Sequence, residues 1–487
     1  MQRTKTSASH LLHPGWTLAL PLLAVTAVLA SPPERRLWSV LVVAPVIALM
    51  QWLIPKCRFR RDHYFSPINL ALLLLSVKVF IAPILAMAVG VTNDLFVRVP
   101  SRESMEGAVA IDLIAYIALC LGLAFTPAHL GAKWRSSILD ALSHTPGPMM
   151  VIFFAALGLM GFLLVFGSPG RIVEYFVDPP AVTDVVHDYE GTWSGLLGTV
   201  LRPFLAFALV AWWTRSVDKR AGDGRSWHPM LAGAIAAIGI TLANMTFSFN
   251  RAAFVFPVVA LVAVYSARAR RISPLVTAAA LIFLAPLLFA LGNYRAKLLA
   301  PPTAPSGAEA SLQEAADEIQ AYTGGPPLAA IFLDDAKWGA HPYGGSTLVA
   351  SLLSPAPFLG KGFRDSNGAT LYNRALYGMP GFDDQIIPFS AELFVNFHAL
   401  GVLAGFFLLG QVLGRGHLWF AAVGSSFGAF AIQYVLMWCA TLTVWSMSVF
   451  SQIAIYFLGP IYLYCAVVQI RTWLRGMRTP TLASSFS

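Results

Sequence analysis

Long apolar runs separated by mostly short polar segments dominate this sequence. Each run is about 17–25 residues long, which is the length that an α-helix needs to cross a hydrocarbon core of roughly 30 Å. A transmembrane β-barrel would instead show alternating segments of about ten residues. The pattern therefore predicts an all-α, polytopic transmembrane helix bundle of about 12 spans. The predicted spans cover residues 15–30, 37–54, 68–91, 108–126, 148–167, 195–213, 229–246, 252–267, 273–292, 390–413, 418–440 and 448–469.

One long polar segment divides the spans into two groups. Residues 1–292 form a bundle of helices 1–9, and residues 390–487 form helices 10–12 and a tail. Between them, residues 293–389 are expected to form a large loop outside the cytoplasm. Residues 308–319 are rich in Ala and Glu, which have good helix propensity, and a second short helix is expected over 369–377. Aromatic residues in this loop favour an ordered structure.

The composition excludes an ordinary soluble protein. Hydrophobic residues make up 57% of the chain and charged residues 12%, whereas soluble domains carry about 25% charged residues. The four cysteines lie in or beside predicted spans, so neither a disulfide framework nor a paired-cysteine metal site is expected. We expect no metal and no other cofactor.

The net charge of +9 reflects membrane topology. With the N-terminus in the cytoplasm, the inside segments hold 19 of the 33 Lys and Arg residues, although they are short. This bias follows the positive-inside rule. It predicts a multi-pass membrane protein with both termini in the cytoplasm, and it removes the reason to expect a nucleic-acid partner.

Three arginines lie towards the outer ends of predicted spans. Arg202 is in the sixth span, Arg251 opens the eighth, and Arg295 follows the ninth. A single arginine at such a depth is often an anchor that extends to the interface. Three of them beside the one large loop instead favour a shared anionic ligand, because guanidinium groups stay charged and match phosphate oxygens.

The tenth span begins with ionisable and polar residues. Glu392 and Asn396 are four residues apart and so share one helix face, whereas His398 is rotated away from them. Ionisable residues at membrane depth are costly and usually have a partner or face a cavity. Lys78, deep in the third span, is expected to form a buried structural pairing.

Three segments resemble one known family in the order that the family has them. They are FNRAAF at 249–254; the basic turn RARR at 268–271, followed by an apolar helix that ends in YR at 294–295; and PFSAELFVNF at 388–397 with GVLAG at 401–405. The family is that of the oligosaccharide repeat-unit polymerases, the Wzy-type O-antigen and exopolysaccharide polymerases. The resemblance covers residues 195–415. His398 departs from it, because the family usually has Gly there.

The resemblance implies a GT-C-like glycosyltransferase in the bacterial inner membrane. It would polymerise oligosaccharide repeat units linked to undecaprenyl diphosphate on the outer face, among membrane lipids and with a chain-length-determining co-polymerase as partner. Glu392 would accept a proton or orient the acceptor, and Asp365 is the second candidate. The diphosphate or the substrate would be bound by Arg202, Arg251, Arg295, Arg364, Asn396 and His398.

Two alternatives stay open at this stage. An O-antigen ligase would use the same donor and topology with another acceptor. A lipid-linked oligosaccharide flippase or other transporter would require polar residues along the whole depth of several helices, whereas the charges here lie towards the outer side. The order of preference is polymerase, ligase and transporter.

Overall fold

A computed structural model gives the fold of most of the chain. It describes residues 14–56, 65–90, 99–127, 137–177, 193–220, 228–246, 251–270, 272–273, 312–334, 342–356, 360–377 and 386–478. All regular structure in these ranges is helical, and they contain no β-strand. The prediction of an all-α protein is confirmed for the described residues.

The described helices differ widely in length. Their bounds are α1 (Pro14–Ala30), η1 (Pro33–Arg35), α2 (Val40–Lys56), α3 (Pro67–Ser76), the π-helical turn η2 (Val77–Ile81), α4 (Ala82–Val89), α5 (Arg102–Ala124), α6 (Ser137–Leu142), α7 (Pro148–Phe166), α8 (Pro169–Val177), α10 (Trp193–Leu201), α11 (Pro203–Arg220), α12 (His228–Met245), α13 (Arg251–Arg268), α15 (Leu312–Thr323), α16 (Pro326–Asp334), α18 (Ser346–Leu353), η4 (Gly360–Gly362), η5 (Arg364–Ser366), α19 (Gly368–Tyr377), α20 (Phe389–Ala422), α21 (Ser426–Thr441), α22 (Met447–Tyr456) and α23 (Gly459–Arg478).

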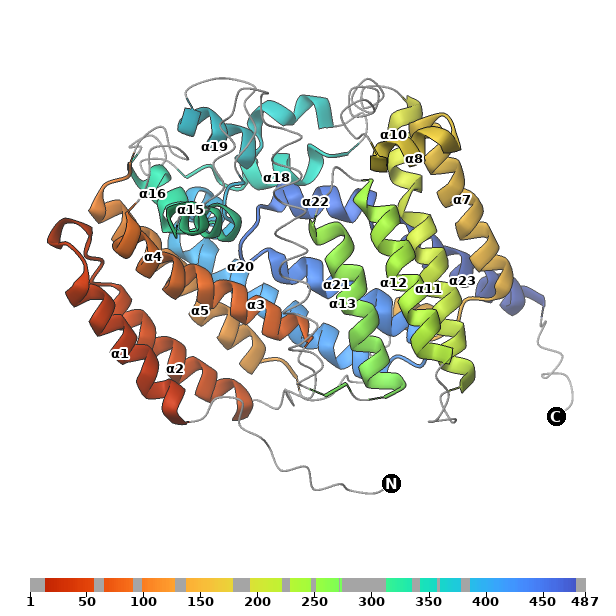
Figure 1. The fold of residues 1–487 in the computed structure, drawn as a ribbon, viewed down its shortest axis with the longest axis horizontal. Coiled ribbons are helices and arrows are strands. Elements are labelled where there is room, and N and C mark those ends of the chain that lie inside the picture. The colour runs from red at the N-terminus through yellow and green to blue at the C-terminus, as the bar shows by residue number, and fades with distance from the viewer. Residues whose placement is uncertain are drawn as a thin grey trace, which may run out of the picture.

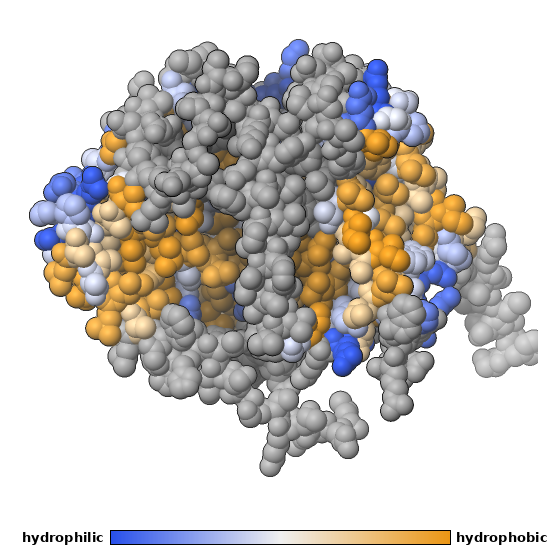
Figure 2. Space-filling model, in the orientation of Figure 1, coloured by the Kyte–Doolittle hydropathy of each residue, from blue (hydrophilic) through white to orange (hydrophobic). Residues whose placement is uncertain are grey.

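Several of these helices are long and apolar enough to cross a membrane. Five qualify by length and composition, and a sixth is added if the bent pair α22–α23, whose halves meet at 52°, counts as one span. Five shorter apolar helices accompany them. Every predicted span that falls in the described ranges overlaps one of these helices or pairs, whereas the span predicted at 273–292 lies outside them. Figure 2 shows an apolar band around the middle of the molecule, with hydrophilic residues above and below it.

The boundary between the tenth and eleventh predicted spans was wrong. A loop was expected at 414–417, but α20 continues through these residues to Ala422. Gly414 and Gly416 lie inside the helix and pack closely against neighbouring side chains. A Cβ at Gly414 would overlap the hydroxyl of Thr126, and one at Gly416 would overlap the side chain of Leu436.

Helices α5 and α20 form the most extensive helix–helix contact of the described bundle. Glycines allow the two backbones to approach closely: a Cβ at Gly122 would overlap the carbonyl oxygen of Phe407, and one at Gly410 would overlap that of Leu119. Small residues at such interfaces are typical of membrane helices, whose association depends on close packing. Gln411 adds a hydrogen bond of 2.6 Å to the Gly122 carbonyl.

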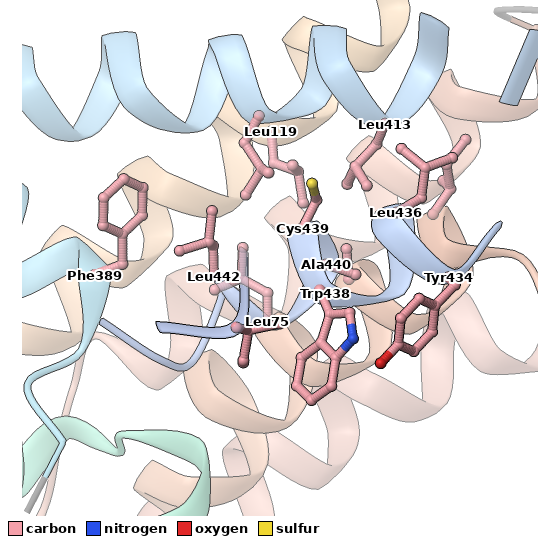
Figure 3. Close-up of a cluster of buried hydrophobic side chains, with 14 of the residues drawn as sticks. Leu75, Leu119, Phe389, Leu413, Tyr434, Leu436, Trp438, Cys439, Ala440 and Leu442 are labelled. Atoms are coloured by element: carbon pink, nitrogen blue, oxygen red, sulfur yellow. The ribbon is translucent and has the colours of Figure 1, made fainter. Parts of the chain in front are cut away.

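Helix α21 lies at the centre of the bundle and is buried along nearly all of its length. Figure 3 shows residues of this helix between Tyr434 and Ala440, and Leu442 just after its end, among Leu75 of α3, Leu119 of α5 and Phe389 of α20. This core connects the first group of helices to the last.

The long segment between the two groups forms a helical cap at one end of the bundle (Figure 1). Helix α15 packs on α4, α16 packs on α5, and α18 packs on α20 and α22. The helix predicted over 369–377 is confirmed as α19, and α15 continues the Ala- and Glu-rich run from Leu312 to Thr323. Asp334, at the end of α16, accepts hydrogen bonds from the amide (2.8 Å) and hydroxyl (2.7 Å) of Ser101, the residue before α5.

Candidate functional site

The beginning of α20 is the point where the cap meets the bundle. Pro388 ends the cap in an extended conformation, and the first turn of α20 from Phe389 to Glu392 is buried. A carboxylate in the first turn is favoured by the helix dipole. Glu392 is nevertheless fully buried, so it also requires hydrogen-bond donors from elsewhere in the protein.

Two elements supply the donors for Glu392. The Ser351 hydroxyl of α18 donates to Oε1 at 2.6 Å, and the Met447 amide donates to Oε2 at 3.0 Å. Met447 is the first residue of α22, where the amide has no partner within its own helix. The Gly368 amide of α19 in turn donates to the Ser351 hydroxyl at 3.1 Å. Glu392 therefore joins α18 and α22 to α20, with α19 connected through Ser351.

Asn396 makes a second connection one turn further along α20. Its Nδ2 donates to the Thr347 hydroxyl of α18 at 2.6 Å and to the Glu392 carbonyl at 2.7 Å. Its Oδ1 accepts from the Gly345 amide at 3.0 Å. The prediction that Glu392 and Asn396 share a helix face is confirmed, and this face holds α18 against α20.

A cleft of about 650 Å³ opens beside these connections. It lies between α18, the segment before η5 and the exposed ring of Phe397 on α20. Apolar atoms form most of its surface. Its lining residues are Gly344, Gly345, Ser346, Leu348, Val349, Ala350, Phe363, Ser366 and Phe397.

Arg364 and Asp365 lie in the chain between two lining residues of the cleft, although neither of them lines it. They form the short helix η5 with Ser366, and the cleft is lined by Phe363 before them and Ser366 after them. Both side chains are exposed. Of the two predicted acid–base candidates, Asp365 is thus exposed beside the cleft, whereas Glu392 is buried behind α18.

His398 interrupts α20 directly after the site. Its backbone has φ 55° and ψ −154°, and it is the one non-glycine residue with positive φ in the described part of the chain. These angles are close to a region that glycine adopts far more readily than other residues. The cap is attached just before His398: the Tyr343 amide donates to the Val395 carbonyl (3.0 Å), and the Gly344 amide donates to the Asn396 carbonyl (3.2 Å).

Replacing His398 with glycine is expected to stabilise the protein. The substitution removes the strain of the positive φ, and after the entropic cost of glycine the net gain is about 1 kcal/mol. Thermal unfolding in detergent, followed by tryptophan fluorescence, measures it. The control is Ala399→Gly, one residue later in regular helix, which should lower the unfolding temperature. If both variants lower it equally, His398 is not strained.

The structure describes the three outer arginines to different extents. Arg202 is buried between α10 and α11, and it donates to the Thr246 carbonyl (3.0 Å) and the Thr199 hydroxyl (3.4 Å). Arg251 is the first residue of α13, but its side chain is outside the described part. Arg295 lies entirely outside the described residues.

The expected pairing of Lys78 is confirmed. Its Nζ lies 2.9 Å from Asp112 Oδ1 of α5, and both side chains are fully buried. Lys78 also donates to the Ser390 hydroxyl at 2.8 Å, and this hydroxyl donates to Asp112 Oδ1 at 2.6 Å.

Sequence reasoning missed Asp112, Ser390 and Ser351 as members of the site. A buried aspartate within an apolar run was a usable signal for Asp112, whereas the serines carried none.

The described residues contain no group of three or more His, Cys, Asp or Glu side chains arranged to hold a metal ion. The polar groups described in and beside the cleft are the exposed Arg364 and Asp365 and the buried network around Glu392.

No family model, no curated protein and no solved structure matches the chain.

Proposed function

We propose that this protein is a membrane glycosyltransferase that polymerises oligosaccharide repeat units carried on undecaprenyl diphosphate, at the outer face of the bacterial inner membrane. The observation that supports this proposal is the apolar cleft beside α18, with the exposed Arg364 and Asp365 between its lining residues Phe363 and Ser366. An apolar cleft with a few polar groups at one edge is typical of small-molecule sites. A polyprenyl diphosphate has the same division between an apolar chain and a charged head.

The exposed apolar residues around the cleft suit a lipid substrate. Val349 of α18 is 51% exposed, and Leu400 of α20 is 79% exposed. In a membrane these side chains would contact lipid, so that a polyprenyl chain enters the cleft sideways from the bilayer. Lys361 and Arg364, both exposed, then supply positive charge for the diphosphate. Arg251 and Arg295 remain proposed partners of the same group, and Arg202 is proposed to support it from the α10–α11 junction.

The proposed reaction forms one bond and breaks another. The oxygen of an acceptor hydroxyl attacks the anomeric carbon of the donor sugar, and the bond from that carbon to the diphosphate oxygen breaks. The diphosphate leaves with the electron pair, and arginine charge stabilises it. The proton of the acceptor hydroxyl passes to the carboxylate of Asp365. Glu392 is enclosed by α18 and α22, so we assign it the positioning of these helices rather than contact with substrate.

Polymerisation by the purified protein tests this proposal. The protein in detergent is mixed with lipid-linked repeat units of its host, and the products are separated by size. A ladder of products is expected. If repeat units are instead transferred once to a lipid A core acceptor, the protein is a ligase. Movement of intact lipid-linked units across vesicle membranes without new glycosidic bonds would mean a transporter. A co-polymerase partner, if it acts, should change the length of the ladder.

A further inference from the structure

The first turn of α20 is held by hydrogen bonds on both of its faces, and we call this arrangement the clamp. Ser390 and Glu392 are two residues apart, which places them on opposite sides of a helix. Ser390 contacts Lys78 and Asp112, and Glu392 contacts Ser351 and Met447. The turn therefore lies between a buried ion pair on one side and the helices of the cap and α22 on the other.

The ion-pair side of the clamp has features that apolar packing would not require. Burying two charges in a membrane-spanning bundle is costly, and such residues are usually functional. Lys78 lies in η2, and single π-helical turns within α-helices occur frequently at functional sites. Asp112 Oδ1 accepts from both Lys78 and Ser390, so α5, η2 and α20 meet at one atom. This arrangement fixes the rotation and depth of the first turn of α20 against two other helices.

We propose that Lys78, Asp112 and Ser390 are positioning residues that hold Glu392 in place against α18 and α22. Ser390 is the connection between the ion pair and α20 because its hydroxyl accepts from Lys78 and donates to Asp112. A shift of the first turn moves the Glu392 carboxylate relative to the Met447 amide and the Ser351 hydroxyl. It thereby moves α18, which forms one wall of the cleft. The catalytic part of this inference rests on the proposed function, whereas the clamp does not.

Ser390→Ala is the variant that separates positioning from simple stability. It removes both hydrogen bonds of the hydroxyl and leaves the direct Lys78–Asp112 bridge of 2.9 Å in place. The matched control is Ser425→Ala. Ser425 is also buried at the start of a helix, and its hydroxyl donates to the Leu142 carbonyl at 2.6 Å and accepts from the Gly428 amide at 2.9 Å. Neither of these hydrogen bonds involves a residue of the clamp.

The first readout does not depend on activity. Hydrogen exchange of the Met447 amide reports the bond to Glu392, and in Ser390→Ala we expect it to be about tenfold faster than in the wild type. In Ser425→Ala the rate should be unchanged. Ser390→Thr retains a hydroxyl and should restore slow exchange. Unchanged exchange in Ser390→Ala would overturn the inference.

The second readout is the rate of polymerisation. In Ser390→Ala, kcat should fall about a hundredfold with KM within about twofold of the wild type. The reacting groups would be displaced, whereas the residues that bind the substrate would remain. Equal losses in Ser390→Ala and Ser425→Ala would mean general destabilisation and would contradict positioning. If Ser390→Ala does not fold, Ser390→Cys, whose thiol is a weaker hydrogen-bond donor and acceptor, must show the same changes to a smaller degree. A wild type that makes no polymer, combined with the expected exchange result, would refute the proposed function and leave the clamp standing.

Discussion

Lys78→Met is expected to destabilise the protein by about 3–5 kcal/mol, because it leaves the buried carboxylate of Asp112 without its counter-charge. The Ser390 hydroxyl alone cannot neutralise this group. The expected result is a large fall in the unfolding temperature in detergent, or loss of folded protein from the membrane.

The paired variant Lys78→Met/Asp112→Leu is the control for this prediction. Replacing a whole buried ion pair with apolar residues of similar size is often neutral or stabilising. The double variant should therefore unfold near the wild-type temperature. If Lys78→Met alone is as stable as the wild type, then Asp112 does not depend on the ion pair of 2.9 Å for its counter-charge.

Gly122→Ala is expected to be the second strongly destabilising change. Its added methyl group would overlap the backbone carbonyl of Phe407, and backbone of a helix cannot move aside as a side chain can. Helices α5 and α20 must then separate, at a cost of about 3 kcal/mol. Because α20 carries Glu392, the separation should also weaken the contact with α18.

Gly170→Ala, which makes the same substitution in helix α8, serves as the control. A Cβ there would have only the Ser168 hydroxyl near it, at 3.9 Å. Alanine is the better helix former, so this variant should be as stable as the wild type or slightly more stable. Equal unfolding temperatures for Gly122→Ala and the wild type would show that α5 and α20 do not pack as closely as described.

The positions of the helices follow from local sequence, and so could be predicted. An apolar run of the right length predicts a membrane helix whatever lies around it. The helix at 369–377 could also be predicted from local sequence, and so could the shared face of Glu392 and Asn396, since helical spacing alone fixes it. The transmembrane orientation remains a prediction from the charge bias.

The details that shape the site come from contacts between distant segments. The partner of Glu392 on α18 is 41 residues away, and that of Ser390 on α5 is 278 residues away. Serines give no signal of such pairing in the sequence. The break at His398 was equally hidden, because the cap and the bundle together hold a histidine in a conformation that suits glycine. The continuation of α20 through 414–417 depended on the glycine contacts with its neighbours.

The proposed function places glycosyl transfer at the cleft beside Arg364 and Asp365. Polymer ladders made by Asp365→Asn and Arg364→Ala are compared with those of the control Arg374→Ala, an exposed arginine of α19 whose chain neighbours do not line the cleft. We predict that Asp365→Asn lowers kcat at least about a hundredfold, in the range that a lost proton acceptor causes, and that Arg364→Ala also loses the ladder while Arg374→Ala keeps it. Ladders of wild-type length and rate from both Asp365→Asn and Arg364→Ala would contradict glycosyl transfer at this cleft.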